Sequence, residues 1–297
     1  MIAFGGQRGR LPHSIGMAST ENGVRDAVER ALREDSPTGD LTTSSVVPEI
    51  ARCRAELRAK GEGVLAGTEA AQAAFAVVAA QDRLGAVEVW WKVRDGEAVR
   101  AGDILAIVEG PARSVLRAER VAINFLGHLS GVATLTRRFV EAARPAEVLC
   151  TRKTTPGLRT LEREAVVAGG GSLHRASLSD AVLIKDNHLR VTGGVRKAVR
   201  AARRAGVPVE VEVETLDELQ EALAAGADRI LLDNPSPELV RQAVARVSDP
   251  RRLEVSGGIT LDSVPLLVQA GARVISVGRI THSAPSLDLS LEVTDVH

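Results

Sequence analysis

The sequence predicts an α/β protein with two parts of different texture. Between about residues 21 and 117, alternating apolar and polar residues at 53–59 and 86–93 indicate strands of an antiparallel sheet mixed with helices. From about residue 145, short β-rich runs alternate with helical segments, which is typical of βα units with parallel strands. A chain of 297 residues with 44% hydrophobic residues can build one large domain or two ordinary ones.

The first part begins with a predicted helix over residues 23–33, followed by a loop at 34–40 that is dense in turn-forming residues. After the two predicted strands, Asp95-Gly96 has the composition of a hairpin turn. A long stretch with helical periodicity over 115–143 then predicts a helix that connects the two parts.

The second part contains six β-rich runs whose first residues are 20 to 34 positions apart: 147–150, 181–184, 209–213, 229–232, 253–255 and 274–277. Helical segments are predicted between them, at 158–168, 195–205, 216–224, 237–247 and 261–270. A closed or partly closed barrel and an open doubly wound sheet both fit this alternation. We favour the barrel, because no glycine-rich nucleotide-binding fingerprint follows the first run.

Charge and composition argue against several classes of function. The 38 basic and 38 acidic residues give a formal net charge of zero, whereas general nucleic-acid binders and membrane-surface proteins carry a basic excess. The longest apolar run, 73–80, is too short to span a bilayer. Two distant cysteines, Cys53 and Cys150, favour a reduced, cytoplasmic protein over a disulfide scaffold. We therefore expect small-molecule ligands, and no nucleic-acid or membrane partner.

The N-terminal residues 1–15 carry Arg8 and Arg10 but lack the sustained apolar stretch of a signal peptide. Met17 is a candidate alternative start. We expect residues 1–20 to form a disordered extension outside the folded part.

The ends of the six runs gather the residues that carry chemistry. In βα barrels the active site lies at the carboxyl ends of the strands. Here these ends comprise Thr151-Arg152-Lys153, Lys185-Asp186-Asn187-His188, Glu212 to Glu214, Asp233-Asn234, Ser256-Gly257-Gly258 and Gly278-Arg279. One polar strand end is ordinary turn chemistry. Six together, with two of the five lysines of the chain, predict a functional site at this rim.

The run at 209–213 continues into Glu214 and alternates valine with glutamate. Period two places the valines on one face and Glu210, Glu212 and Glu214 on the other. Such a strand is either an edge strand with a solvated acidic face, or one that points its carboxylates into the mouth of the barrel. The cations at neighbouring strand ends favour the second arrangement, because they offset the cost of inward carboxylates. These carboxylates can hold Mg²⁺ or the hydroxyls of a sugar.

Glycine-rich segments predict anion binding at the same rim. Gly257-Gly258 leads toward a helix and Gly278 ends the last run, where barrels often bind a phosphate. Three glycines at 169–171 allow a close backbone approach and precede His174-Arg175. With the cations after the first two runs, this pair predicts a cluster that binds carboxylates. We expect a carboxylate ligand beside a phosphorylated, hydroxyl-rich ligand with a metal.

Several longer motifs are specific enough to indicate a family. They are Thr151-Arg152-Lys153-Thr154-Thr155-Pro156-Gly157, residues 169–175, 180–188, 210–214 and 231–234, Ser256-Gly257-Gly258 and Thr281-His282-Ser283, with 39–43, 63–67 and 119–131 in the first part. Together they resemble the quinolinate phosphoribosyltransferases, also called carboxylating nicotinate-nucleotide pyrophosphorylases. The resemblance covers nearly everything from residue 21 onward.

The resemblance implies a fold and a reaction. The fold is an N-terminal α/β sandwich domain (21–125, joined by the C-terminal segment 285–297) followed by an incomplete, seven-stranded α/β barrel (126–284). The reaction transfers the phosphoribosyl group of phosphoribosyl pyrophosphate to quinolinate, with Mg²⁺, and yields nicotinate mononucleotide, pyrophosphate and CO₂ for NAD biosynthesis. The resemblance also implies a homodimer.

Site residues carry over position by position. The family's quinolinate-binding cations match Arg152, His174, Arg175 and Lys185, and an arginine supplied across the dimer interface matches Arg120. The catalytic and metal-site residues around pyrophosphate and ribose match Lys153, Glu212 and Asp233, of which Glu212 and Asp233 serve Mg²⁺. The 5′-phosphate cradle matches Ser256, Gly257, Gly258 and Gly278.

The chain departs from the family pattern at a few positions. Cys150 stands where the family usually has aspartate, Leu173 where it usually has asparagine, and Ala176-Ser177 and Arg279 also differ. A paralogue acting on a related pyridine carboxylate in secondary metabolism is therefore an alternative. A non-catalytic metabolite-binding barrel is another, from a different class. The molybdenum-transport-associated relatives lack the lysine that this chain keeps at Lys185.

Overall fold

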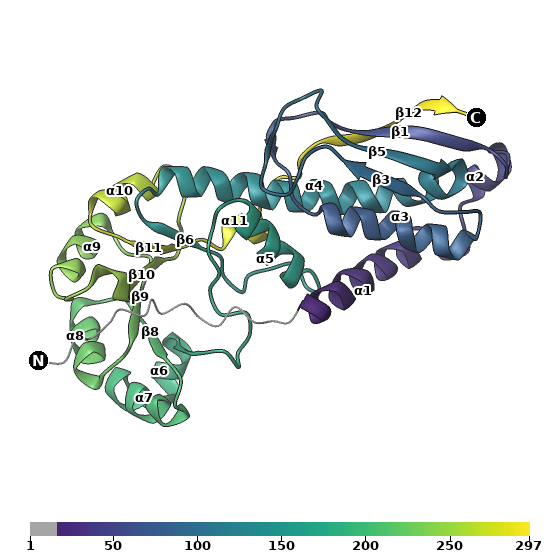
Figure 1. Ribbon diagram of the computed structural model, residues 1–297. Helices are drawn as coiled ribbons and strands as arrows, with labels where there is room; N and C mark the ends of the chain where they lie inside the picture. Colours follow the sequence, from purple (N-terminus) through teal and green to yellow (C-terminus); the bar gives the residue numbers. More distant parts are fainter. Residues whose placement is uncertain (1–16) are drawn as a thin grey trace, which may run out of the picture.

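The computed structural model describes residues 17–297 and shows two parts joined by one long helix (Figure 1). This helix, α4 (Ala112–Ala142), is the predicted connection over 115–143, and it contacts elements of both parts. The expected extension over 1–20 falls mostly on residues 1–16, which lie outside the described residues. The first helix, α1 (Met17–Asp35), begins at Met17 rather than at residue 23.

The N-terminal part is a two-layer sandwich. Its antiparallel sheet has the order β12-β1-β5-β3, built from β1 (Arg52–Ala59), β3 (Glu88–Trp91), β5 (Ile104–Pro111) and β12 (Leu289–Val296). Helices α1, α3 (Thr68–Asp82) and α4 lie together beneath this sheet in Figure 1, and the short α2 (Leu41–Val46) lies at its end. The alternation that predicts β1 buries every second residue, from Cys53 to Ala59.

The predicted hairpin at Asp95-Gly96 is wrong. Strand β3 pairs with β5, whereas β4 (Ala98–Val99) pairs with β2 (Gly63–Val64), so the strands on either side of the turn are not partners. The Asp95 carboxylate instead accepts hydrogen bonds from the backbone nitrogens of Gly67 (2.9 Å) and Thr68 (3.3 Å). It thereby satisfies unpaired N–H groups at the start of α3. Asp95-Gly96 does form a turn, closed by the hydrogen bond from the backbone nitrogen of Glu97 to the carbonyl oxygen of Arg94 (3.1 Å), but this turn does not join two paired strands.

The C-terminal part is a curved parallel sheet wrapped by helices (Figure 1). Its strand order is β6-β11-β10-β9-β8-β7. The strands are β6 (Glu147–Leu149), β7 (Val182–Ile184), β8 (Val209–Val213), β9 (Arg229–Asp233), β10 (Leu253–Ser256) and β11 (Val274–Ser276). The main covering helices are α5 (Arg159–Ala168), α7 (Val195–Ala202), α8 (Leu216–Ala225), α9 (Pro237–Val244) and α10 (Val264–Gln269), with the short α6 (Asp186–Thr192) and α11 (Arg279–His282) directly after strand ends. Every predicted β-rich run of this part is a strand.

The barrel is incomplete, with six strands instead of the seven that the resemblance implies. The segment after the three glycines adds only a single parallel bridge, between Leu149 and Ser172. The glycines themselves are pressed against α4, since a Cβ on Gly169 would lie 2.5 Å from the carbonyl oxygen of Ala133. Within residues 17–297, no ladder joins this segment to β7, so the sheet stays open there.

The chain returns from the barrel to the first sheet along α4. Residues 285–287 run so close to this helix that a Cβ on Gly131 would lie 2.1 Å from the carbonyl oxygen of Pro285. The chain then enters β12, which pairs antiparallel with β1. None of the described helices combines the length and apolar character needed to cross a membrane.

Replacing Gly131 by alanine is expected to lower the free energy of unfolding by roughly 1–3 kcal/mol, because the added methyl group meets backbone that must shift. The measurement is the urea midpoint followed by circular dichroism. Gly23→Ala is the control, because a Cβ on Gly23 in α1 meets nothing within 4 Å and alanine favours a helix by about 1 kcal/mol. An unchanged midpoint for Gly131→Ala would show that residues 285–287 are free to move away.

Candidate active site

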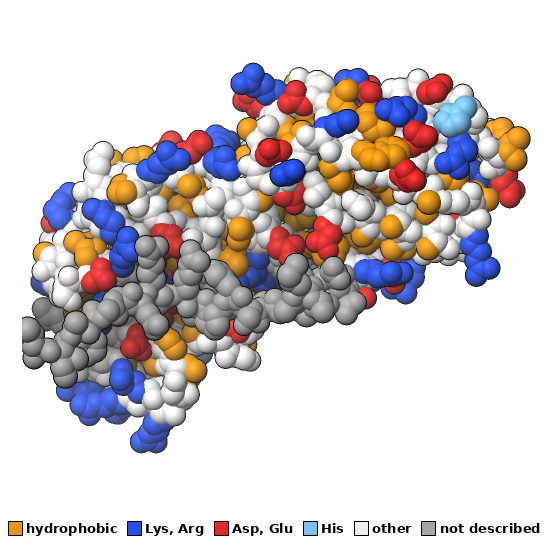
Figure 2. All heavy atoms as spheres, viewed as in Figure 1, with side chains coloured by type: hydrophobic (Ala, Val, Ile, Leu, Met, Phe, Trp, Pro, Cys, Tyr) orange, Lys and Arg blue, Asp and Glu red, His pale blue; other side chains and the backbone are white. Residues whose placement is uncertain are grey.

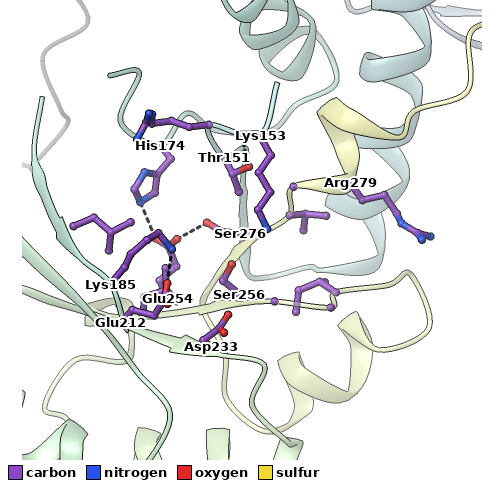
Figure 3. Close-up of a pocket in the computed structure, with 18 of the residues that line it drawn as sticks. Thr151, Lys153, His174, Lys185, Glu212, Asp233, Glu254, Ser256, Ser276 and Arg279 are labelled. Carbon is purple, nitrogen blue, oxygen red and sulfur yellow. Dashed lines mark hydrogen bonds and ion pairs between the residues drawn. The ribbon is translucent and has the colours of Figure 1, made fainter. Parts of the chain in front are cut away.

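A pocket of about 520 Å³ opens at the carboxyl ends of the parallel strands (Figure 3). Almost all the site residues expected from the sequence line it: Arg152, Lys153, His174, Arg175, Lys185, Glu212, Asp233, Ser256, Gly257, Gly258 and Gly278. Arg120 does not line it; this residue is exposed on α4. Residues from all six strand ends and from the 169–175 segment therefore meet in one cavity, as expected for a parallel barrel.

Two arginines give one side of the pocket an excess of positive charge. Among the side chains described, residues 23–297, neither Arg152 nor Arg175 forms an ion pair with a carboxylate. The buried Nε of Arg152 has no hydrogen-bond partner, and Arg175 donates from Nη1 to the carbonyl oxygen of Ala181 (3.1 Å). Burial and the neighbouring charge of Arg152 lower the pKa of the Arg175 guanidinium. Two cations that repel each other in a half-buried pocket favour binding of an anion.

Lys185 and Glu212 form an ion pair across the pocket (Figure 3). Lys185 lies where β7 passes into α6, and its backbone nitrogen donates to Nδ1 of His188 (2.9 Å). His188 therefore caps the helix and orients the backbone that carries Lys185. Glu212 comes from β8, and its side chain is only 12% exposed.

The alternation of β8 is confirmed for two of its three glutamates. Glu210 and Glu212 point into the barrel, where they meet His174 and Lys185. Glu214 lies beyond the end of β8 and is exposed. Its backbone nitrogen donates to the Glu218 carboxylate (2.9 Å) at the start of α8. The period of two ends with the strand, so the third carboxylate leaves the pocket.

Asp233 supplies the second accessible carboxylate of the pocket. It ends β9, next to Glu212 on the neighbouring strand, and accepts a hydrogen bond from the Asn234 amide (2.8 Å). Within the described part of the chain it forms no ion pair with a cationic side chain. The pocket thus has a cationic side and an acidic side.

The glycines of the last two strand ends bring backbone close to the cavity. Gly257 has φ +88°, and a Cβ there would lie 2.6 Å from the Asn234 side chain. A Cβ on Gly278 would lie 3.0 Å from Cδ of Lys153, which passes over it. The predicted helix after Gly257-Gly258 begins only at Val264. A phosphate at Gly257-Gly258 would therefore meet loop backbone, whereas Gly278 is the N-cap residue of the short α11.

Two residues that the sequence reading missed lie at the floor of the pocket. Glu254 of β10 is 1% exposed, and Ser276 of β11 donates a hydrogen bond to it. The His174 Nε2 atom lies 3.1 Å from Oε2 of Glu210 and 3.4 Å from Oε2 of Glu254. The signal was available, because period two in Leu253–Ser256 places Glu254 on the face opposite Leu253 and Val255. A strand of four residues is too short for this alternation to stand out.

Two of the residues that depart from the family pattern, Cys150 and Leu173, lie behind the pocket and do not line it. Cys150 is fully buried at the end of β6, and burial raises the pKa of its thiol. Arg163 of α5 lies beside it (Nη1 to Sγ, 4.0 Å) and donates to the carbonyl oxygen of His174 (2.8 Å). The two departures therefore change the support of His174 rather than the pocket surface. Arg279 lines the pocket, but its guanidinium points away from the other labelled groups (Figure 3).

Fold and pocket together define the class of protein: an α/β-barrel enzyme whose cationic and acidic groups face one cavity. Models of the two domains of quinolinate phosphoribosyl transferase match residues 40–130 (N-terminal domain) and 132–292 (C-terminal domain). The chain belongs to the quinolinate phosphoribosyltransferase family.

Individual relatives agree with this assignment over nearly the full chain. A Bacillus subtilis (strain 168) protein named probable nicotinate-nucleotide pyrophosphorylase (carboxylating) is 43% identical over 266 residues, which cover 88% of this chain and 90% of the relative. A protein of the same name from Methanothermobacter thermautotrophicus is 38% identical and covers 91% and 99%. The solved nicotinate-nucleotide pyrophosphorylase from Francisella tularensis superposes with a TM-score of 0.85 at 39% identity and covers 92% of this chain and 97% of that structure.

Proposed function

We propose that the protein transfers the phosphoribosyl group of phosphoribosyl pyrophosphate to quinolinate and releases pyrophosphate and CO₂, forming nicotinate mononucleotide for NAD biosynthesis. Membership of the family supports the reaction. The observation that carries the choice of acceptor is the unpaired Arg152–Arg175 pair. A pyridine dicarboxylate supplies two carboxylates, one for each of these arginines that has no anionic partner among the described side chains. Guanidinium groups bind carboxylates with two parallel hydrogen bonds.

The remaining groups have roles that follow from their charge and place. His174 and Lys185 complete the cationic side around the acceptor. Glu212 and Asp233 face the ribose, where the reaction centre gains positive charge as the pyrophosphate leaves, and fixed carboxylates stabilise such charge. Lys153 lies over Gly278 and offsets the charge of the leaving pyrophosphate, while Ser256, Gly257 and Gly258 hold the 5′-phosphate.

Mg²⁺ fits the acidic side of the pocket. Asp233 and Glu212 offer carboxylate oxygens from adjacent strand ends, and Asp233 has no cationic partner among the described side chains. Mg²⁺ is usually held by one or two carboxylates together with substrate phosphates. When bound it would supply positive charge to the pyrophosphate.

We further propose a cytoplasmic homodimer. The exposed position of Arg120 on α4, away from the pocket of its own subunit, suits an arginine that acts in the site of the other subunit. In the dimer, Arg120 of the partner subunit would add a cation to the acceptor side. Two cysteines that are buried and unpaired suit a reduced compartment.

The test follows both products of the reaction. With phosphoribosyl pyrophosphate, Mg²⁺ and quinolinate labelled in its 2-carboxylate, we expect stoichiometric release of pyrophosphate and labelled CO₂. If neither pyrophosphate nor labelled CO₂ is released, the proposal is wrong. A panel of pyridine mono- and dicarboxylates serves as the comparison, and a better acceptor than quinolinate would identify a paralogue for a related pyridine carboxylate. Binding without turnover of any acceptor would point to a metabolite-binding barrel.

A further inference from the structure

A buried charge cluster underlies the pocket and includes only one of the expected site residues. His174 lies between two carboxylates from different strands, Glu210 of β8 and Glu254 of β10, and a single ring nitrogen, Nε2, faces both (3.1 and 3.4 Å). The Glu210 and Glu254 residues are 7% and 1% exposed. Figure 3 shows the His174 ring directed down toward Glu254 and Ser276.

The geometry fixes the position of one proton. A deprotonated Nε2 would turn its lone pair toward two carboxylates, and this arrangement is repulsive. Nε2 therefore carries hydrogen and donates to Glu210. Because this one hydrogen goes to Oε2 of Glu210, Oε2 of Glu254 is left without a hydrogen-bond partner. The buried Oε1 of Glu210 also has none.

When both carboxylates are ionised, the charge of the cluster balances only if His174 is protonated. Burial and the charge of Glu254 raise the pKa of Glu210, and His174 and Arg229 oppose this shift. The two carboxylates bring two negative charges, and Arg229 of β9 brings one positive charge, with Nη2 lying 3.9 Å from Oε2 of Glu254. A second positive charge is needed for neutrality, and His174 is the titratable group between the carboxylates. Buried charges are costly unless they are paired, so folding favours imidazolium. The other charged or titratable groups around His174 are Cys150, Arg152, Arg163, Arg175, Lys185 and Glu212.

We propose that Glu254, together with Glu210, is a positioning residue that holds His174 as a permanent imidazolium beside Arg152 and Arg175, so that the acceptor subsite keeps its full positive charge well above neutral pH. The inference rests on the proposed function only in naming a pyridine dicarboxylate as the anion that binds in the acceptor subsite. Neither glutamate needs to touch the substrate, because both act through the histidine.

The titration behaviour agrees with this arrangement. Burial by itself lowers the pKa of His174, but the hydrogen bond to Glu210 and the negative charges of Glu210 and Glu254 outweigh it and raise this pKa from 6.5 to about 9. Because the protonated form is the one that attracts an anion, the contribution of His174 to acceptor binding is complete at neutral pH. It is lost only as the pH rises through about 9.

The same three donors satisfy the spacing of a metal site, with one nitrogen and two carboxylates within 4.8 Å of one another. The charge balance favours the proton instead. Arg229 already compensates one carboxylate, and a divalent cation would have to displace the Nε2 hydrogen and leave an excess positive charge next to Arg229. Metal binding is one of the outcomes that the experiment separates.

The experiment is a pH titration by NMR of full-length protein with ¹³C-labelled histidine, without substrate. The sequence has six histidines, and His174→Asn assigns the resonance. We expect His174 to titrate near 9 in the wild type and at least about one unit lower in Glu254→Gln, which keeps the side-chain shape and removes the charge. Arg229→Gln removes the compensating cation and should shift the pKa of His174 upward.

The matched control is Glu162→Gln. Glu162 is also fully buried and contacts the Nε2 of a histidine, His128 (2.9 Å), but outside the pocket. This variant should leave the titration of His174 unchanged. A wild-type pKa near 6.5, or equal values in the wild type and both Glu254→Gln and Arg229→Gln, overturns the proposal. So does displacement of the His174 proton by added Zn²⁺ at pH 7. Opposite shifts of the His174 pKa in Glu254→Gln and Arg229→Gln exclude general damage to the fold. If Glu254→Gln does not fold, Arg229→Gln still tests the proposal, because Arg229 is partly exposed.

Acceptor binding provides the functional readout. For quinolinate alone, the dissociation constant of the wild type should stay nearly constant between pH 6 and 8, whereas that of Glu254→Gln should match it at pH 6 and rise at least about twofold at pH 8. A pH-independent loss in the variant would contradict the proposed role of charge. If no variant and no wild-type sample binds quinolinate at any pH, the proposed function fails. The NMR titration still decides the state of His174.

Discussion

Arg152→Ala is expected to weaken binding of quinolinate by about 100-fold or more while leaving the fold as stable as before. Truncating one partner of a desolvated, hydrogen-bonded charge pair costs roughly 2–5 kcal/mol, and each 1.4 kcal/mol is a factor of ten. Truncating Arg152 removes no ion pair within the protein, because Arg152 has no carboxylate partner among the described side chains. Its Nε is buried without an acceptor. Removing it also relieves the repulsion that Arg175 experiences.

Calorimetric titration with quinolinate and a urea midpoint test both halves of this prediction. Arg279→Ala is the matched control, since Arg279 lines the same pocket but directs its guanidinium away from it (Figure 3). We expect less than about a fivefold change there, as for a charge at the rim of a site. Wild-type affinity in Arg152→Ala would remove this residue from the acceptor site, and a large loss of stability would show that its charge is needed for folding.

Asp233→Asn is expected to lower kcat by about 100- to 1000-fold with little change in the KM for quinolinate. The asparagine keeps the size of the side chain but can neither stabilise positive charge on the ribose nor serve as a charged ligand of Mg²⁺, and loss of one electrostatic contact to a transition state typically costs this much. The acceptor lies on the cationic side of the pocket, so its binding should persist.

Steady-state kinetics with each substrate varied in turn measure this effect, together with the Mg²⁺ concentration needed for half-maximal rate. Asp262→Asn is a suitable control. Asp262 lies shortly after the Gly257-Gly258 loop, is exposed and does not line the pocket. An unchanged kcat in Asp233→Asn would assign the acidic role to Glu212 alone. A parallel rise in the KM for quinolinate would place Asp233 on the acceptor side instead.

The pocket could be predicted from the sequence because it is built on strand ends. Once the six β-rich runs are placed in one parallel sheet, Lys185, Glu212 and Asp233 have to share a rim, and the structure brings them together. The alternation of β8 even gave the inward direction of Glu212. Position along a strand determines both the edge and the face of a residue, and each can be read from a single sequence.

Features that depend on contacts between distant segments could not be predicted in this way. The composition of Asp95-Gly96 suits a hairpin, and only the placement of α3 shows that the carboxylate caps a helix. The segment around the three glycines forms one bridge at Ser172 and no ladder with β7, and its close contact with α4 has no counterpart in the local sequence. Glu254 gains its meaning from His174, which lies eighty positions earlier in the chain. None of these pairings has a local signal.

The return of the chain to its first sheet has a consequence for synthesis. Strand β1 is complete early in the chain, but its partner β12 (Leu289–Val296) follows the whole barrel in the sequence. Until β12 has been synthesised and has left the ribosome, one edge of β1 has no strand beside it, and open edges invite pairing with other chains. The N-terminal sandwich can therefore finish folding only after the barrel has been translated, which makes nascent chains truncated before residue 289 the species most dependent on chaperones.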